Sequence, residues 1–137
     1  MHGLCSLLLL FFIKMRYLIP GIIMILVDIV YLSTFGKNIF IPMLESIQRE
    51  KVQFKWYAAI LCYIFLVFGL DYFIISQRRP LIDAFVLGVC IYGVYETVNL
   101  ATFKKWKPIP SLIDTVWGGT LMAITTYLTY KVKALKH

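Results

Sequence analysis

Three carboxyl groups lie within runs of residues that are otherwise apolar. Asp28 stands in ILVDIVYL (25–32), Glu96 in IYGVYETVNL (91–100) and Asp114 in SLIDTVWGG (111–119). An acidic side chain in an apolar helix is costly unless it faces the interior of a bundle or a polar cavity. In such a place it binds a proton, helps to hold a cation or hydrogen-bonds to a neighbouring helix. These three residues are therefore the first candidates for chemistry.

Helical spacing places further polar residues beside these acids. Tyr92, Glu96 and Asn99 follow one another at i, i+4 and i+7, so they share one face of a helix. Asp114 shares a face with Trp117, and the two glycines after Trp117 allow a second helix to approach closely. The resulting candidate polar cluster consists of Asp28, Tyr92, Glu96, Asn99, Asp114 and Trp117.

Each acid also has a purely structural interpretation. Asp114 forms a capping box with Ser111 if the last helix begins at that serine. Asp28 can hydrogen-bond across a bundle to a Tyr, Asn or Trp side chain. Asp71 lies near the opposite membrane surface and is interpreted as an interfacial residue. No Lys, Arg or His falls within the expected spans, so the sequence offers these acids no counter-ion there.

The composition indicates a membrane protein rather than a soluble domain. Of the 137 residues 61% are hydrophobic and only 15% are charged, and the mean hydropathy is +0.81. A soluble domain carries about 25% charged residues. The net charge of +7 does not indicate nucleic-acid binding, because the basic residues sit at the ends of apolar runs, where they meet lipid headgroups. The three cysteines are scattered and show no metal or redox spacing.

Four segments are long enough to cross a bilayer, which takes about 20 apolar residues. They are residues 17–35, 56–76, 82–102 and 112–130. We therefore expect an all-α, polytopic membrane protein with four transmembrane helices in an antiparallel bundle. Both termini and the loop between the second and third spans would lie on one side, termed side A. The loop between the first and second spans (the 1–2 loop) and the loop between the third and fourth spans would lie on side B. Seven basic residues fall on each side, so the orientation in the membrane is not predicted.

The segments outside these spans give two further expectations. Residues 1–14 form an apolar N-terminal extension that is too short to span, and Met15 is a plausible start, so a single domain would cover residues 15–137. The 1–2 loop is expected to hold about 20 residues. Residues 42–51 within that loop are either a short interfacial helix over side B or an irregular linker.

Four stretches resemble a known family of small membrane proteins. They are LVDIVYL (26–32), YAAILCYIFLVFGLDYFII (57–75), GVCIYGVYETVNLATFKKW (88–106) and LIDTVWGG (112–119). On these motifs the chain resembles domain of unknown function family 2177 over about residues 15–130. Two departures are visible, because Glu96 replaces a usual Asp and Val98 is inserted between Thr97 and Asn99. The resemblance implies a four-helix integral membrane protein and supplies no activity.

Three classes of function remain open at this point. The sequence favours a non-enzymatic, multi-pass integral membrane protein whose acidic cluster binds a lipid headgroup, a cation or a proton, or which acts as a partner subunit. A lipid-modifying enzyme would use the acids to hold Mg²⁺ or Mn²⁺, or as general acid and base. A channel or transporter would need a homo-oligomer, because four helices leave little room for a pathway. The expected partners are the lipid bilayer and further copies of the chain, and no catalytic residue or cofactor is assigned.

Overall fold

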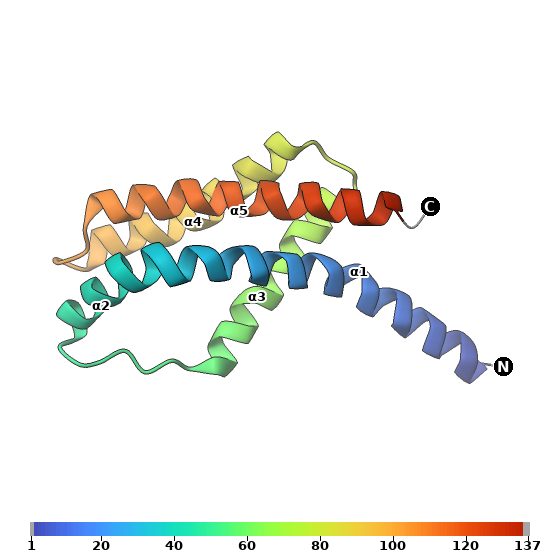
Figure 1. Ribbon diagram of the computed structural model, residues 1–137, viewed down its shortest axis with the longest axis horizontal. Helices are drawn as coiled ribbons and strands as arrows, with labels where there is room; N and C mark the ends of the chain where they lie inside the picture. Colours follow the sequence, from blue (N-terminus) through green and yellow to red (C-terminus); the bar gives the residue numbers. More distant parts are fainter. Residues whose placement is uncertain (1, 136–137) are drawn as a thin grey trace.

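The computed structural model describes residues 2–135, and all of its regular elements are helices (Figure 1). In chain order they are α1 (His2–Tyr31), the π-helix η1 (Leu32–Phe40), α2 (Ile41–Gln48), α3 (Trp56–Leu70), the π-helix η2 (Asp71–Ile75), α4 (Leu81–Thr102) and α5 (Pro108–Leu135). The predicted all-α class is therefore confirmed. The start of α1 and the end of α5 lie at the same end of the molecule, which corresponds to side A (Figure 1).

Three helical stretches are long and apolar enough to cross a membrane: Gly3–Gln48, Trp56–Ile75 and Leu81–Thr102. The fourth predicted span, 112–130, is helical within α5, but it is not among these three. The reason lies in its composition, since α5 carries the buried threonines Thr125, Thr126 and Thr129. Helix α5 lies alongside α4 and also contacts α1 (Figure 1). A helix surrounded by other helices needs less apolar surface than one that faces lipid.

The predicted long loop after the first span is wrong. The helical backbone continues from α1 through η1 into α2, so the connection to α3 is only residues 49–55. Pro42 lies in the first turn of α2 and does not interrupt this path. Helix α2 covers much of the interfacial helix considered for residues 42–51, but it continues the first helix rather than starting after a loop. Arg49, with φ 59°, then ends it in the left-handed conformation.

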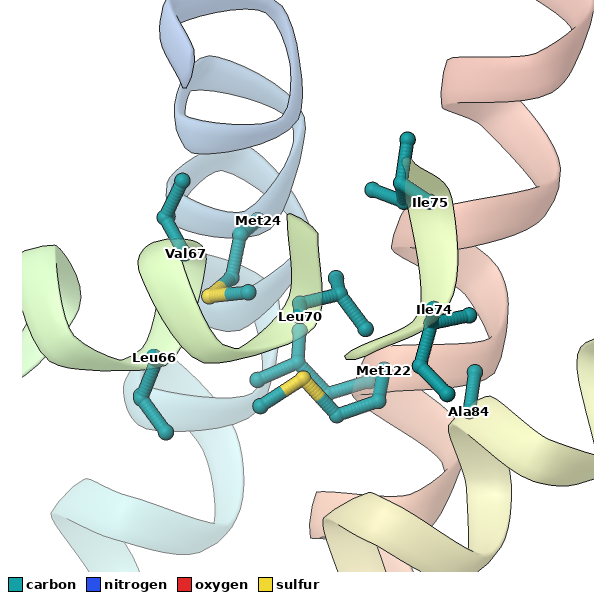
Figure 2. Packing of buried hydrophobic residues seen from close by; sticks show 9 residues of the cluster. Met24, Leu66, Val67, Leu70, Ile74, Ile75, Ala84 and Met122 are labelled. Carbon is teal, nitrogen blue, oxygen red and sulfur yellow. The ribbon is translucent and has the colours of Figure 1, made fainter. Parts of the chain in front are cut away.

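The hydrophobic core lies where α1, α3, η2, α4 and α5 meet (Figure 2). Met24 of α1 contributes one wall, and Leu70 of α3 is fully buried against it. Leu121 and Met122 of α5 complete the centre, and neither has any exposed surface. Asp28 follows Met24 by one helical turn toward side B. The packing of Met24 in the core therefore sets the depth at which Asp28 lies in the bundle.

Candidate functional site

Asp28 joins three helices through two hydrogen bonds. Its Oδ2 accepts a hydrogen bond from the Tyr63 hydroxyl of α3 at 2.5 Å, and its Oδ1 accepts one from Trp117 Nε1 of α5 at 2.9 Å. Asp28 is buried, with 6% of the residue exposed. Each carboxylate oxygen therefore has its own donor. This is the arrangement that makes a buried carboxylate tolerable.

Asp114 is tied to the same region through Tyr31. The Tyr31 hydroxyl donates to Asp114 Oδ1 at 3.0 Å, which links α1 to the first part of α5. The Tyr31 ring stacks on the Trp117 indole with ring centroids 4.7 Å apart and planes 9° from parallel. Because Trp117 is also the donor to Asp28, the two acids are linked by one pair of stacked aromatic rings.

Glu96 is the most deeply buried of the three acids, with 1% of the residue exposed. Its Oε2 accepts a hydrogen bond from Trp106 Nε1 at 2.8 Å. Its Oε1 is buried without a hydrogen-bond donor among the described residues. The carboxyl group of Asp114 neighbours the Glu96 carboxyl group, and the two groups interact electrostatically. Glu96 and Asp114 therefore form a carboxyl pair between α4 and α5.

Glycines bring α4 and α5 close enough to create this pair. A Cβ atom on Gly88 would collide with the backbone of Gly118 and with the Cα of Gly119 at 2.8 Å. A Cβ atom on Gly118 would collide with the ring of Tyr92. Close backbone contact through small residues is a common way for helices to pack in membranes. Glu96 lies one turn beyond Tyr92, so the same contact sets its position against α5.

The structure brings most of the sequence-predicted cluster together and leaves one member outside. Asp28, Glu96, Asp114 and Trp117 converge, and Tyr92 packs between them over Gly118. Asn99 does not join them, because its side chain lies beside Tyr95 on a partly exposed face of α4.

The predicted capping box at Ser111 is wrong. Helix α5 begins at Pro108, three residues earlier, and the backbone N–H and the hydroxyl of Ser111 both donate to the Lys107 carbonyl. Proline is well suited to the first turn of a helix, and Pro108 allows α5 to begin before Ser111. Asp114 is therefore left to accept a hydrogen bond from Tyr31 instead of capping the helix.

Three hydrogen-bond donors of the site were not among the sequence-predicted site residues: Tyr31, Tyr63 and Trp106. Tyr31 and Trp106 stand near the ends of expected spans, yet they are only 6% and 7% exposed. The sequence did hold one signal for Tyr63, because a tyrosine in the middle of an apolar span needs a partner for its hydroxyl.

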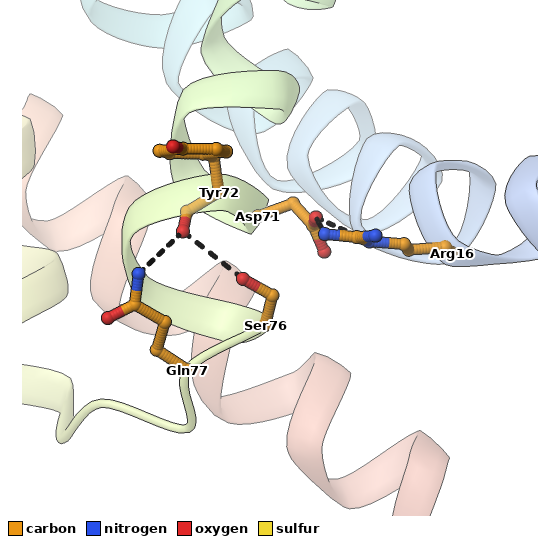
Figure 3. A network of polar contacts seen from close by, with 5 residues as sticks. All are labelled: Arg16, Asp71, Tyr72, Ser76 and Gln77. Atoms are coloured by element: carbon orange, nitrogen blue, oxygen red, sulfur yellow. Dashed lines mark hydrogen bonds and ion pairs between the residues drawn. The ribbon is translucent and has the colours of Figure 1, made fainter.

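The interpretation of Asp71 as an interfacial residue is also wrong. Asp71 is 1% exposed, and its Oδ2 binds Arg16 of α1 through Nε at 2.6 Å and through a second guanidinium nitrogen at 2.5 Å (Figure 3). The Arg16 side chain is 44% exposed, so it reaches the buried carboxylate from the side-A surface. This ion pair fastens η2 to α1 and lies apart from the carboxyl pair.

Metal-ligating residues do not gather in the part of the chain that the structure describes. Within residues 2–135, no group of three or more His, Cys, Asp or Glu side chains is placed to hold a metal ion. The pair of Glu96 and Asp114 supplies only two carboxyl groups.

The long apolar helices and the acidic side chains buried between them define a multi-pass helical membrane protein. A family model described as "Predicted membrane protein (DUF2177)" matches residues 13–131. The chain belongs to this family and is an integral membrane protein with three candidate transmembrane helices. Neither the search of curated proteins nor the search of solved structures finds a match.

Proposed function

We propose that the protein binds a proton inside the membrane, at the carboxyl pair of Glu96 and Asp114. The observation that carries this proposal is the buried Glu96 carboxyl group, which neighbours a second carboxyl group and whose Oε1 has no hydrogen-bond donor among the described residues. Two adjacent carboxylates in a low-dielectric site cannot both remain ionised. One shared proton turns one group into a donor and gives the orphaned oxygen a partner.

The remaining contacts of the pair favour a proton over a metal cation. Trp106 already occupies one oxygen of Glu96, and Tyr31 occupies one oxygen of Asp114. Both oxygens of Asp28 are engaged by Tyr63 and Trp117, so they do not reach toward a shared ligand. Two free oxygens fall well short of the roughly six ligands that Mg²⁺ or Ca²⁺ requires. An anionic lipid headgroup is disfavoured because both groups are acidic.

Proton binding at this pair couples protonation to helix packing. Glu96 belongs to α4 and Asp114 to α5, while Tyr31 holds Asp114 from α1. Loss of the shared proton leaves two like charges between α4 and α5 and drives the helices apart. Asp114 is only half-buried and lies six residues after the start of α5, about 9 Å along the helix. Protons would therefore enter from side B.

Infrared spectroscopy of the purified protein in detergent tests this proposal. The shared proton should give the carbonyl stretch of a protonated carboxylic acid at neutral pH. Glu96→Gln and Asp114→Asn should each abolish this band, whereas Asp83→Asn, on a partly exposed acid paired with Arg79, should leave it unchanged. The glutamine amide can itself donate to Asp114, so Glu96→Gln should still fold. Absence of the band in the native protein, or its persistence in both site variants, would refute proton sharing.

A further inference from the structure

An apolar groove of about 660 Å³ runs between α1 and α3, on the outside of the bundle. Its wall on α1 extends from Lys14 to Ile25, and its wall on α3 extends from Ile60 to Phe68. Gly21 lies in the middle of the α1 wall, and a Cβ atom there would lie 3.8 Å from a methyl group of Val67. The two helices therefore approach each other at the floor of the groove.

The length of the groove matches one leaflet of a bilayer. From Lys14 to Ile25 the helix advances about 16 Å at 1.5 Å per residue. Half of a hydrocarbon core of about 30 Å is about 15 Å. The span expected from the sequence, residues 17–35, places Lys14 at the side-A surface and Ile25 near the middle of the membrane. Its dimensions suit the acyl chain of a lipid from a single leaflet.

Positive charge is concentrated at the surface end of the groove. Lys14 is the only charged side chain among the groove-lining residues. Lys133 of α5 lies within electrostatic range of both Arg16 and Arg78 on the same side of the protein. The one acid of this cluster, Asp71, is already bound by Arg16. The cluster therefore keeps a net positive charge on the side of the protein where the groove begins.

We propose that this groove binds an anionic phospholipid of the side-A leaflet, with its acyl chain between α1 and α3 and its phosphate near Lys14. The combination of an apolar groove, one leaflet long, with excess positive charge at its surface end supports this ligand class. The site lies apart from the carboxyl pair, and the proposal does not depend on proton binding there.

Native mass spectrometry of the full chain in a neutral detergent tests the proposal. Dioleoyl phosphatidylglycerol and dioleoyl phosphatidylcholine are titrated separately, and apparent dissociation constants are compared. We expect the anionic lipid to bind more tightly, and Lys14→Gln to reduce that preference roughly fivefold, the effect of one basic residue near an anionic headgroup. Lys104→Gln, an exposed lysine on side B, is the matched control and should leave the preference unchanged.

A second variant tests the groove itself. Leu18→Trp adds bulk from a groove position that is 51% exposed, so it narrows the groove without entering the core. It should weaken binding of both lipids, and Glu96→Gln should weaken neither. Equal affinity for the two lipids, or full binding by Leu18→Trp, would overturn the proposal. Competition by soluble glycerol phosphate as strong as that by the lipid would also overturn it, because it would indicate a phosphate site without an acyl chain.

Discussion

The contact between α4 and α5 can be tested at Gly88. A Cβ atom at this position would lie too close to the carbonyl group of Gly118 and 2.8 Å from the Cα of Gly119. These neighbours are backbone atoms, so they cannot rotate away as the end of a flexible side chain can. Gly88→Ala therefore forces the two helices apart.

The size of the effect follows from two opposing contributions. Replacing a glycine by alanine inside a helix normally stabilises it by about 0.5–1 kcal/mol. Overpacking a tight contact costs about 1–3 kcal/mol. Gly93→Ala is the matched control on the same helix, because its Cβ would meet only a methyl group of Thr115 at 3.5 Å, an ordinary contact. Both variants gain the same helix stabilisation, so their stabilities should differ by the overpacking cost alone, about 1–3 kcal/mol.

Unfolding in mixed micelles measures this difference. The protein is titrated with sodium dodecyl sulfate while its tryptophan fluorescence is followed, since Trp106 and Trp117 both lie inside the bundle contacts. Gly88→Ala should unfold at a clearly lower detergent fraction than Gly93→Ala. It should also weaken the infrared band assigned to the carboxyl pair, because separating α4 from α5 separates Glu96 from its partner. Equal unfolding midpoints for the two alanine variants would refute the close backbone contact.

Two further predictions concern the polar contacts and use the same unfolding assay. Arg16→Gln leaves Asp71 buried without its ion-pair partner, so we expect a loss of about 2–3 kcal/mol, less than for a fully buried pair because the Arg16 side chain is 44% exposed. Arg79→Gln, which breaks an exposed i,i+4 pair, should cost no more than about 0.5 kcal/mol; equal losses would contradict this ranking. Tyr63→Phe removes the donor to one oxygen of Asp28 and should cost about 1–3 kcal/mol; unchanged stability would show that this oxygen finds another partner.

The class of the protein could be predicted from the sequence because it depends on composition and periodicity alone. Apolar runs of about 20 residues have few stable places other than a bilayer. The same physics predicted that Asp28, Glu96 and Asp114 face inward, since hydrocarbon cannot solvate a charge. These statements need no knowledge of which helix lies beside which.

The ends of the helices were less predictable because local signals compete there. SLID reads as a capping box at Ser111, but Pro108 provides an earlier start for α5. The first span was expected to end at residue 35, yet the chain continues in helical form, with Gly36 inside η1 and Pro42 in the first turn of α2. Sequence patterns alone do not show which of two adequate signals is used.

The partners of each acid were decided only by the tertiary structure. Asp28 is bound by residues 35 and 89 positions away in the chain, and Asp114 by one 83 positions away. A hydrogen bond requires its atoms within about 3 Å and well aligned, so it depends on the rotation and height of each helix. The glycine contact between α4 and α5 fixes the rotation and height of α4, which places Glu96 against α5 and leaves Asn99 on a partly exposed face of α4. The sequence by itself determined that acids would be buried in a membrane bundle, and the packing of the helices decided that two of them form a pair.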